Sequence, residues 1–185
     1  ALKWKQAGFD RVQPRVYSVK AKVKEGLCSV RCKMSLAPIY LQKVLELDVT
    51  YIIGGDGSID VTVKGKKEML MPDLPRFGLR LFMPKEMDQA EYYGYGPYES
   101  YIDKKQASYM SRFATTAKEN HEDYIKPQEN GSHYGCLEAL VADEWGSGIE
   151  AVSEKGFNFN ISCYTQEELS SKMHNFELEE ADCTV

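Results

Sequence analysis

The chain has 185 residues, of which 43% are hydrophobic and 28% charged, and this balance is typical of a folded globular protein rather than a disordered one. The formal net charge of −5 disfavours a nucleic-acid partner, because nucleic acids bind basic surfaces. No apolar run approaches ~18 residues, so the sequence predicts no membrane-spanning helix, and residues 1–6 lack the apolar core of an export signal.

The first third of the chain shows strict alternation of apolar and polar residues. In the first run Tyr17, Val19, Ala21 and Val23 alternate with polar residues, and similar runs follow over residues 28–36, 45–51 and 59–63. Period-two alternation is typical of strands with one face in the core and one in water. Short Gly- and Asp-rich turns between the runs predict antiparallel pairing of neighbouring strands.

The rest of the chain predicts further strands and one helix. Strands are expected at Leu79–Met83, Ala90–Tyr93, Leu137–Ala142 and Phe157–Cys163, and residues 94–134 are interpreted as a long loop region. Thr165 followed by Glu168 matches a capping box, which predicts a short helix near residues 165–173. With no βαβ rhythm in the sequence, we expect an all-β fold, an antiparallel β-sandwich of at least about eight strands.

The five cysteines predict neither a disulfide framework nor a metal site. They stand at 28, 32, 136, 163 and 183. An i,i+4 pair on one strand lies roughly 13 Å apart, which is too far for Cys28 and Cys32 to share one ion. We therefore expect free thiols in a reducing compartment, and a cytoplasmic location.

Searching for a catalytic constellation yields no candidate. The sequence has no Gly-rich phosphate loop, no HExxH and no GxSxG. His121-Glu122-Asp123 is interpreted as a solvated loop, and the Glu177, Glu179 and Glu180 cluster as a charged surface. We predict no catalytic residue in this chain.

The tyrosines are the one unusual feature of the composition. Of the twelve, five fall within ten residues: Tyr92, Tyr93, Tyr95, Tyr98 and Tyr101. Such side chains stack on sugar rings, and they also suit a protein interface or a core. Composition favours the interface or core interpretation.

Several stretches resemble the C-terminal β-domain of the large bacterial β-galactosidases of glycoside hydrolase family two. Leu74-Pro75-Arg76-Phe77-Gly78-Leu79 resembles that domain's LPRxGL stretch, and residues 93–101 resemble its GxGPxExY signature. Residues 124–131 resemble YxxPQENG, and residues 157–169 resemble FxFxxxxYTxEEL. The four matches occur in order and span most of the chain from Leu74 onward.

This resemblance implies a galactose-mutarotase-like supersandwich, the small-chain domain, formed as a single domain over residues 1–185 of a larger multidomain chain. The implied parent reaction is retaining hydrolysis of terminal β-galactosides such as lactose. In the family, the catalytic glutamates and the magnesium ligands belong to other parts of the enzyme, so no cofactor is expected here. The family's sugar-site tryptophan follows later in the domain, and we expect the chain to stop before it; neither Trp4 nor Trp145 matches its context.

The resemblance therefore implies an accessory domain of a bacterial cytoplasmic enzyme, whose partners are the remaining domains, especially the TIM barrel, with a homo-oligomer left open. Arg76, Glu99, Glu129 and Asn130 are the predicted polar anchors between domains. The alternative for these four is local turn chemistry.

Two other functions remain as alternatives. One is a mutarotase-like sugar epimerase, in which His133 and Glu129 are a conceivable acid/base pair. The other is a carbohydrate-binding module that uses the tyrosine cluster.

Overall fold

The structure is a computed structural model that describes residues 2–185. The chain forms two compact units, Ala1–Phe77 and Gly78–Val185, which are described separately. Ten strands and two short α-helices are assigned in the described part of the chain, and all strand pairs are antiparallel. The predicted all-β class with antiparallel sheets is confirmed; the single-domain prediction stays a prediction.

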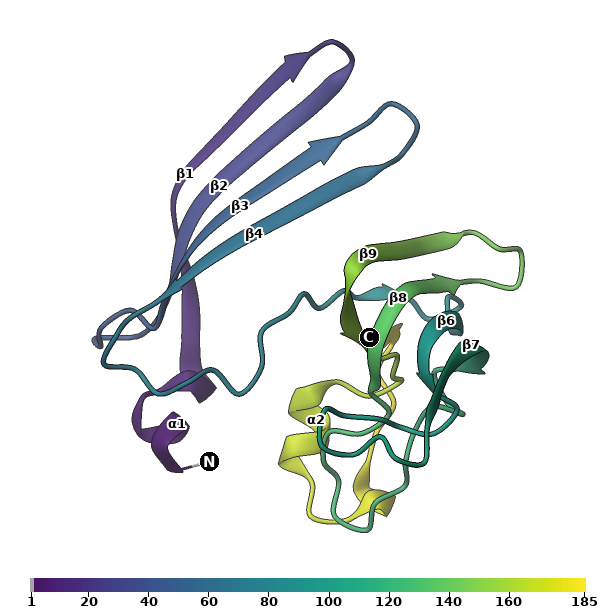
Figure 1. The fold of residues 1–185 in the computed structure, drawn as a ribbon. Coiled ribbons are helices and arrows are strands. Elements are labelled where there is room, and N and C mark those ends of the chain that lie inside the picture. The colour runs from purple at the N-terminus through teal and green to yellow at the C-terminus, as the bar shows by residue number, and fades with distance from the viewer. Residues whose placement is uncertain (1) are drawn as a thin grey trace. The chain divides into compact units, whose positions relative to one another are not determined.

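The first unit is a meander of four strands. After α1 (Leu2–Gln6) and a 3₁₀ turn at Phe9–Arg11, the sheet runs through β1 (Val12–Lys24), β2 (Leu27–Pro38), β3 (Leu45–Ile53) and β4 (Ile59–Lys67). Its order is β1-β2-β3-β4, as the alternation predicts (Figure 1). The β1–β2 turn is made by Glu25 and Gly26, whose φ angles of 52° and 79° are both positive, as in the primed turns that match strand twist.

Register places the apolar residues of neighbouring strands opposite one another. Cys32 pairs with Val19 on one side and with Val49 on the other, and Val49 is 6% exposed. The other face carries charge, for example an ion pair between Arg31 and Asp48. The alternation therefore predicted the two faces of this sheet correctly from Val19 onward.

Tyr17 departs from the predicted alternation. The register of β1 against β2 shifts between Val16 and Ser18, which marks a β-bulge. An extra residue reverses which side of the sheet a side chain faces. The Tyr17 hydroxyl consequently hydrogen-bonds to Ser35 Oγ at 2.8 Å, on the polar face, and its predicted place in the apolar row is wrong.

The second unit contains a second four-stranded sheet. Its strands are β6 (Gln89–Gly96), β7 (Tyr109–Thr116), β8 (His133–Ala142) and β9 (Gly148–Phe159), in the order β7-β6-β8-β9 (Figure 1). A two-stranded pair joins β5 (Met83–Pro84) to β10 (Cys183–Thr184). The helix α2 (Gln166–Ser171) lies where the capping signal predicts it, with Thr165 Oγ1 accepting from Glu168 N–H at 3.1 Å.

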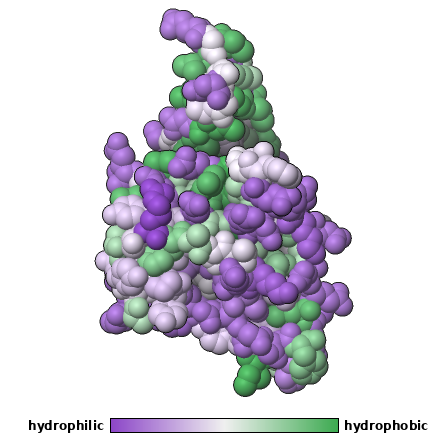
Figure 2. All heavy atoms as spheres, turned by 90° about the vertical axis from the view of Figure 1, so that its right-hand side faces the viewer, coloured by the Kyte–Doolittle hydropathy of each residue, from purple (hydrophilic) through white to green (hydrophobic). Residues whose placement is uncertain are grey.

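The core of the second unit is built from two small groups of buried residues. One contains Ala90, Ala117 and Ile161; the other contains Tyr92, Cys136 and Ala139, with Phe113, Phe157 and Phe159 packed against it. On the face drawn in Figure 2, hydrophobic residues gather in the upper part of the view and hydrophilic residues predominate below it.

Three sequence predictions differ from the structure of this unit. No strand forms over Gly78–Phe82, where Arg80 instead pairs with Glu167 at 2.8 Å. β7 lies inside the predicted loop region. The strand predicted through Cys163 ends at Phe159, because the chain beyond it leaves the sheet.

Candidate functional site

Two of the signature stretches meet at Glu99. Glu99 is buried, with 8% of the residue exposed. Its Oε1 accepts hydrogen bonds from Lys104 Nζ and from the Tyr124 hydroxyl. Its Oε2 accepts from Gly131 N–H at 3.0 Å. We call Glu99, Lys104, Tyr124 and Gly131 the Glu99 cluster; it ties residues 93–104 to residues 124–131.

The electrostatics of the Glu99 cluster favour an ionised carboxylate. Burial by itself raises the pKa of Glu99, but hydrogen bonds from Lys104, Tyr124 and the Gly131 N–H outweigh it and hold that pKa below its ordinary value. The carboxylate in turn raises the pKa of Lys104 and of Tyr124. A carboxylate held by three donors is suited to fixing loops and not to supplying a proton.

A buried histidine supports the same loops from beneath. His133 is 2% exposed, and its Nε2 lies 2.7 Å from Asn120 Oδ1. The Asn120 amide donates to the carbonyls of Gly131 at 2.8 Å and Ile161 at 2.9 Å, so its oxygen is left to accept from His133. Burial lowers the pKa of His133 to about 4, which keeps the ring neutral at pH 7.

Asn130 organises the turn that delivers Gly131. Its side chain is largely buried, accepting from Glu122 N–H at 3.0 Å and donating to the Gln128 carbonyl at 2.9 Å. Gly131 has φ 70°, and a Cβ there would lie 2.4 Å from the Asn120 carbonyl oxygen. The Asn-Gly pair therefore satisfies both a left-handed backbone and a close approach that other residues cannot make.

The structure brings together two of the four predicted anchors. Glu99 and Asn130 both contact the segment around Gly131, and the hydrogen bonds described above for their side chains lie within the second unit. Glu129 is exposed in the same unit, whereas Arg76 is exposed in the first unit. Local loop chemistry is thus established for Glu99 and Asn130. An interdomain role stays a prediction for all four.

Sequence reasoning did not assign roles to Lys104, Tyr124 or Asn120. Lys104 and Tyr124 stand at the edges of the two signature stretches, which is the signal that could have identified them. Asn120 has no comparable signal, because its role depends on contacts with residues 11, 13 and 41 positions away in sequence.

A hollow of about 320 Å³ lies beside the Glu99 cluster. Tyr98, Lys104, Lys105, Glu122 and Tyr124 are among the residues that line it. The Lys104 side chain is 59% exposed despite its pairing with Glu99. The named residues therefore present two lysines, two tyrosines and a carboxylate to whatever lies against this surface, which suits hydrogen bonding to a polar partner.

The sites imagined for the alternative functions are not formed. His133 is buried and bonded internally, so it is not available to act on a sugar with the exposed Glu129. The tyrosine cluster is divided: Tyr92 is 1% exposed in the core, while Tyr98 is 63% exposed. It is not one exposed platform.

Among residues 2–185, no group of three or more His, Cys, Asp or Glu side chains is placed to hold a metal ion. All five cysteines are free thiols. No helix in this described part is both long and apolar enough to cross a membrane.

Comparison with known proteins decides the family. The sequence profile of the family described as "Beta galactosidase small chain" matches residues 1–185. The chain belongs to the β-galactosidase small-chain family.

Its relatives are longer proteins. A β-galactosidase of Actinobacillus pleuropneumoniae is 41% identical over 182 residues, which cover 98% of this chain and 18% of that protein. A β-galactosidase of Staphylococcus xylosus is 34% identical over 181 residues, again 98% of this chain and 18% of the relative. One of Streptococcus thermophilus is 34% identical over 141 residues. This chain thus spans less than a fifth of the length of these relatives.

Proposed function

We propose that this chain is a non-catalytic accessory domain of a β-galactosidase that hydrolyses terminal β-galactosides such as lactose. One observation carries the proposal: the small-chain profile matches the whole chain, while the chain accounts for only 18% of the relatives named β-galactosidase. The catalytic machinery is expected in the remaining parts of such a protein, together with any magnesium.

The Glu99 cluster supports a structural role for the signature loops. Its hydrogen bonds hold residues 93–104 against residues 124–131 and leave Tyr98, Lys104 and Tyr124 at the rim of a hollow. We infer that this rim docks on the parent's TIM barrel and shapes the mouth of the sugar pocket. The supersandwich arrangement of the two sheets, retaining stereochemistry and a cytoplasmic location belong to the same proposal; the free thiols support the last.

Replacing Glu99 in the full-length polypeptide tests the accessory role. We expect Glu99→Gln to raise KM for a chromogenic β-galactoside by up to about tenfold and to change kcat less, since loosened loops cost about 1.4 kcal/mol of binding. Glu119→Gln is the matched control, because Glu119 is exposed and lies outside the cluster. Loss of turnover by about 10⁴-fold in a folded Glu99→Gln protein, as expected for a catalytic carboxylate, would overturn the proposal.

A further inference from the structure

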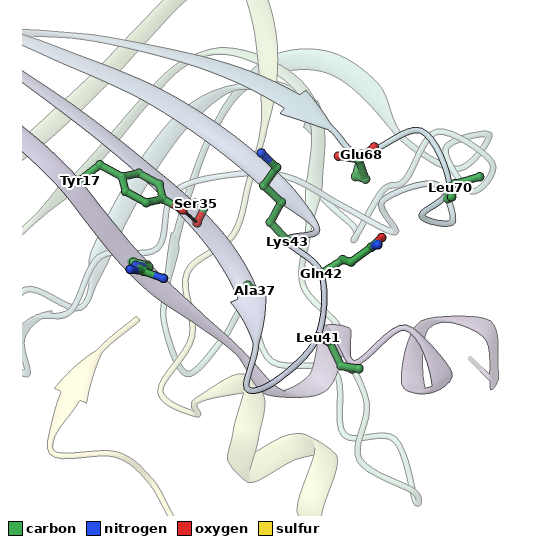
Figure 3. A pocket seen from close by; sticks show the side chains of 9 residues that line it. Tyr17, Ser35, Ala37, Leu41, Gln42, Lys43, Glu68 and Leu70 are labelled. Carbon is green, nitrogen blue, oxygen red and sulfur yellow. Dashed lines mark hydrogen bonds between the residues drawn. The ribbon is translucent and has the colours of Figure 1, made fainter.

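A second hollow, of about 580 Å³, opens in the first unit beside the β1 bulge (Figure 3). Its lining includes Arg15, Tyr17, Ser35, Gln42, Lys43 and Glu68. The volume is in the range of small-molecule sites. None of these residues belongs to the Glu99 cluster or to the four signature stretches.

The bulge places an aromatic ring in this hollow and holds it there. Without the register shift between Val16 and Ser18, Tyr17 would face the apolar side of the sheet. With it, the hydroxyl bonds to Ser35 Oγ at 2.8 Å, drawn as the dashed line in Figure 3. Ser35 is only 1% exposed, while Tyr17 is 58% exposed. The ring is thus anchored at its polar tip and open over much of its surface, with the Arg15 guanidinium 5.6 Å from its centroid.

The charges around the ring nearly balance. The Lys43 ammonium pairs with the Glu46 carboxylate beside the hollow, and the pKa of Lys43 is raised by Glu46 and more weakly by Glu68. The hollow and its edge therefore carry two cations, Arg15 and Lys43, and two carboxylates, Glu46 and Glu68. Gln42 adds an amide that both donates and accepts. A balanced set of donors and acceptors suits a neutral hydroxyl-rich ligand better than an anion.

We propose that the Tyr17 hollow binds a neutral saccharide, a mono- or disaccharide galactoside whose apolar ring face stacks on Tyr17. Hydroxyls of the sugar then reach Gln42, Lys43 and Glu68. An aromatic ring with polar groups at its edge is the usual arrangement for such a ligand, because sugar rings present C–H faces and hydroxyl rims. The choice of galactoside rests on the proposed function, while the site itself is separate from catalysis.

Saturation-transfer NMR of methyl 1-thio-β-galactoside, whose thioglycosidic bond resists hydrolysis by a β-galactosidase, tests the site. In the 185-residue chain we expect transfer to the sugar ring protons, about tenfold weaker binding in Tyr17→Ala, and about twofold to threefold weaker binding in Tyr17→Phe, which keeps the ring and loses the bond to Ser35. Tyr40→Ala is the control, because Tyr40 is fully exposed and does not line the hollow; it should bind as wild type. Circular dichroism checks that each variant is folded.

The same spectra on the full-length polypeptide isolate this site, because the difference between wild type and Tyr17→Ala excludes signal from the catalytic pocket. Equal transfer in wild type and Tyr17→Ala, or none in wild type, would overturn the proposal. So would competition by inorganic phosphate, which would indicate an anion site. Failure of the full-length wild type to hydrolyse a chromogenic galactoside would instead count against the proposed function and would leave Tyr17-dependent binding standing.

Discussion

Glu99 is the residue on which the loops of the second unit converge. Burial disfavours a charged carboxylate, but three hydrogen-bond donors stabilise the charge of Glu99: Lys104, the Tyr124 hydroxyl and the backbone N–H of Gly131. Removing the charge leaves the Tyr124 hydroxyl and the N–H of Gly131 with a weaker acceptor. Two stretches that match family signatures therefore meet at one carboxylate and at the groups that donate hydrogen bonds to it.

The charge of Glu99 should make stability depend on pH. Since its folded pKa lies below the unfolded value of about 4.3, its contribution is present above that value and is lost as pH falls through the folded pKa. We expect Glu99→Gln to lower the free energy of unfolding by about 1–3 kcal/mol at pH 7. Urea denaturation should show the difference shrinking below about pH 4. Glu119→Gln should stay within about 0.5 kcal/mol of wild type at both pH values.

His133 has a packing role, although the sequence allows it to be interpreted as an acid/base residue. A histidine near a glutamate invites an acid/base interpretation. Its ring is in fact stacked on Tyr92 with centroids 4.0 Å apart, bonded to Asn120 and almost fully buried. Its burial excludes the acid/base interpretation in favour of packing, and no sequence pattern at this position reveals that burial.

At the scale of elements, alternation was sufficient where a strand pairs along its length with at least one neighbouring strand. The β1–β4 meander follows from it, and so does the helix after Thr165, where a local capping bond specifies the start. Leu79–Met83 alternates as well, but no strand pairs with residues 78–82 there. Alternation predicts a strand only when another strand completes its hydrogen bonds.

The sequence did not predict β7 (Tyr109–Thr116), because apolar and polar residues do not alternate along this strand. Its inward Phe113 packs on Tyr92 with centroids 5.5 Å apart, but its outward positions include Met110 and Ala114, so polarity does not alternate along it. The bulge at Tyr17 could not be predicted from the sequence either, because one extra residue reverses which face the side chains occupy without changing the composition.

The candidate site was predictable only as two signature stretches. The contacts that join these two stretches were not predictable, because they link residues 25–32 positions apart.

The turn at Gly131 gives a test of loop architecture. An alanine at position 131 would have a left-handed backbone, and its Cβ would lie 2.4 Å from the Asn120 carbonyl oxygen. An alanine at position 146 would have a similar φ of 81°, but its Cβ would point into open space. We expect Gly146→Ala to cost about 1 kcal/mol and Gly131→Ala about 2 kcal/mol more, through the clash. Thermal unfolding of the two variants measures the difference. Equal effects would mean that the loop yields without cost and that the close approach is unimportant.

At the scale of the molecule, the two units differ in how completely their apolar residues are covered. In the second unit Tyr92, Cys136 and Ile161 are each at most 2% exposed. In the first unit Val19 and Val23 of β1 are 61% and 77% exposed. Exposed apolar residues along an edge strand are expected of a part that functions within a larger protein, which agrees with the share of the β-galactosidase relatives that the chain spans.

We propose that this small-chain domain assists catalysis without performing it. Release of chromophore from a nitrophenyl β-galactoside, measured side by side for the purified 185-residue chain and the full-length polypeptide, tests that claim most directly. We expect turnover by the full-length polypeptide and none by the chain at equal molar concentration. Turnover by the chain alone, retained through purification and abolished by substitution of one of its own carboxylates, would contradict it.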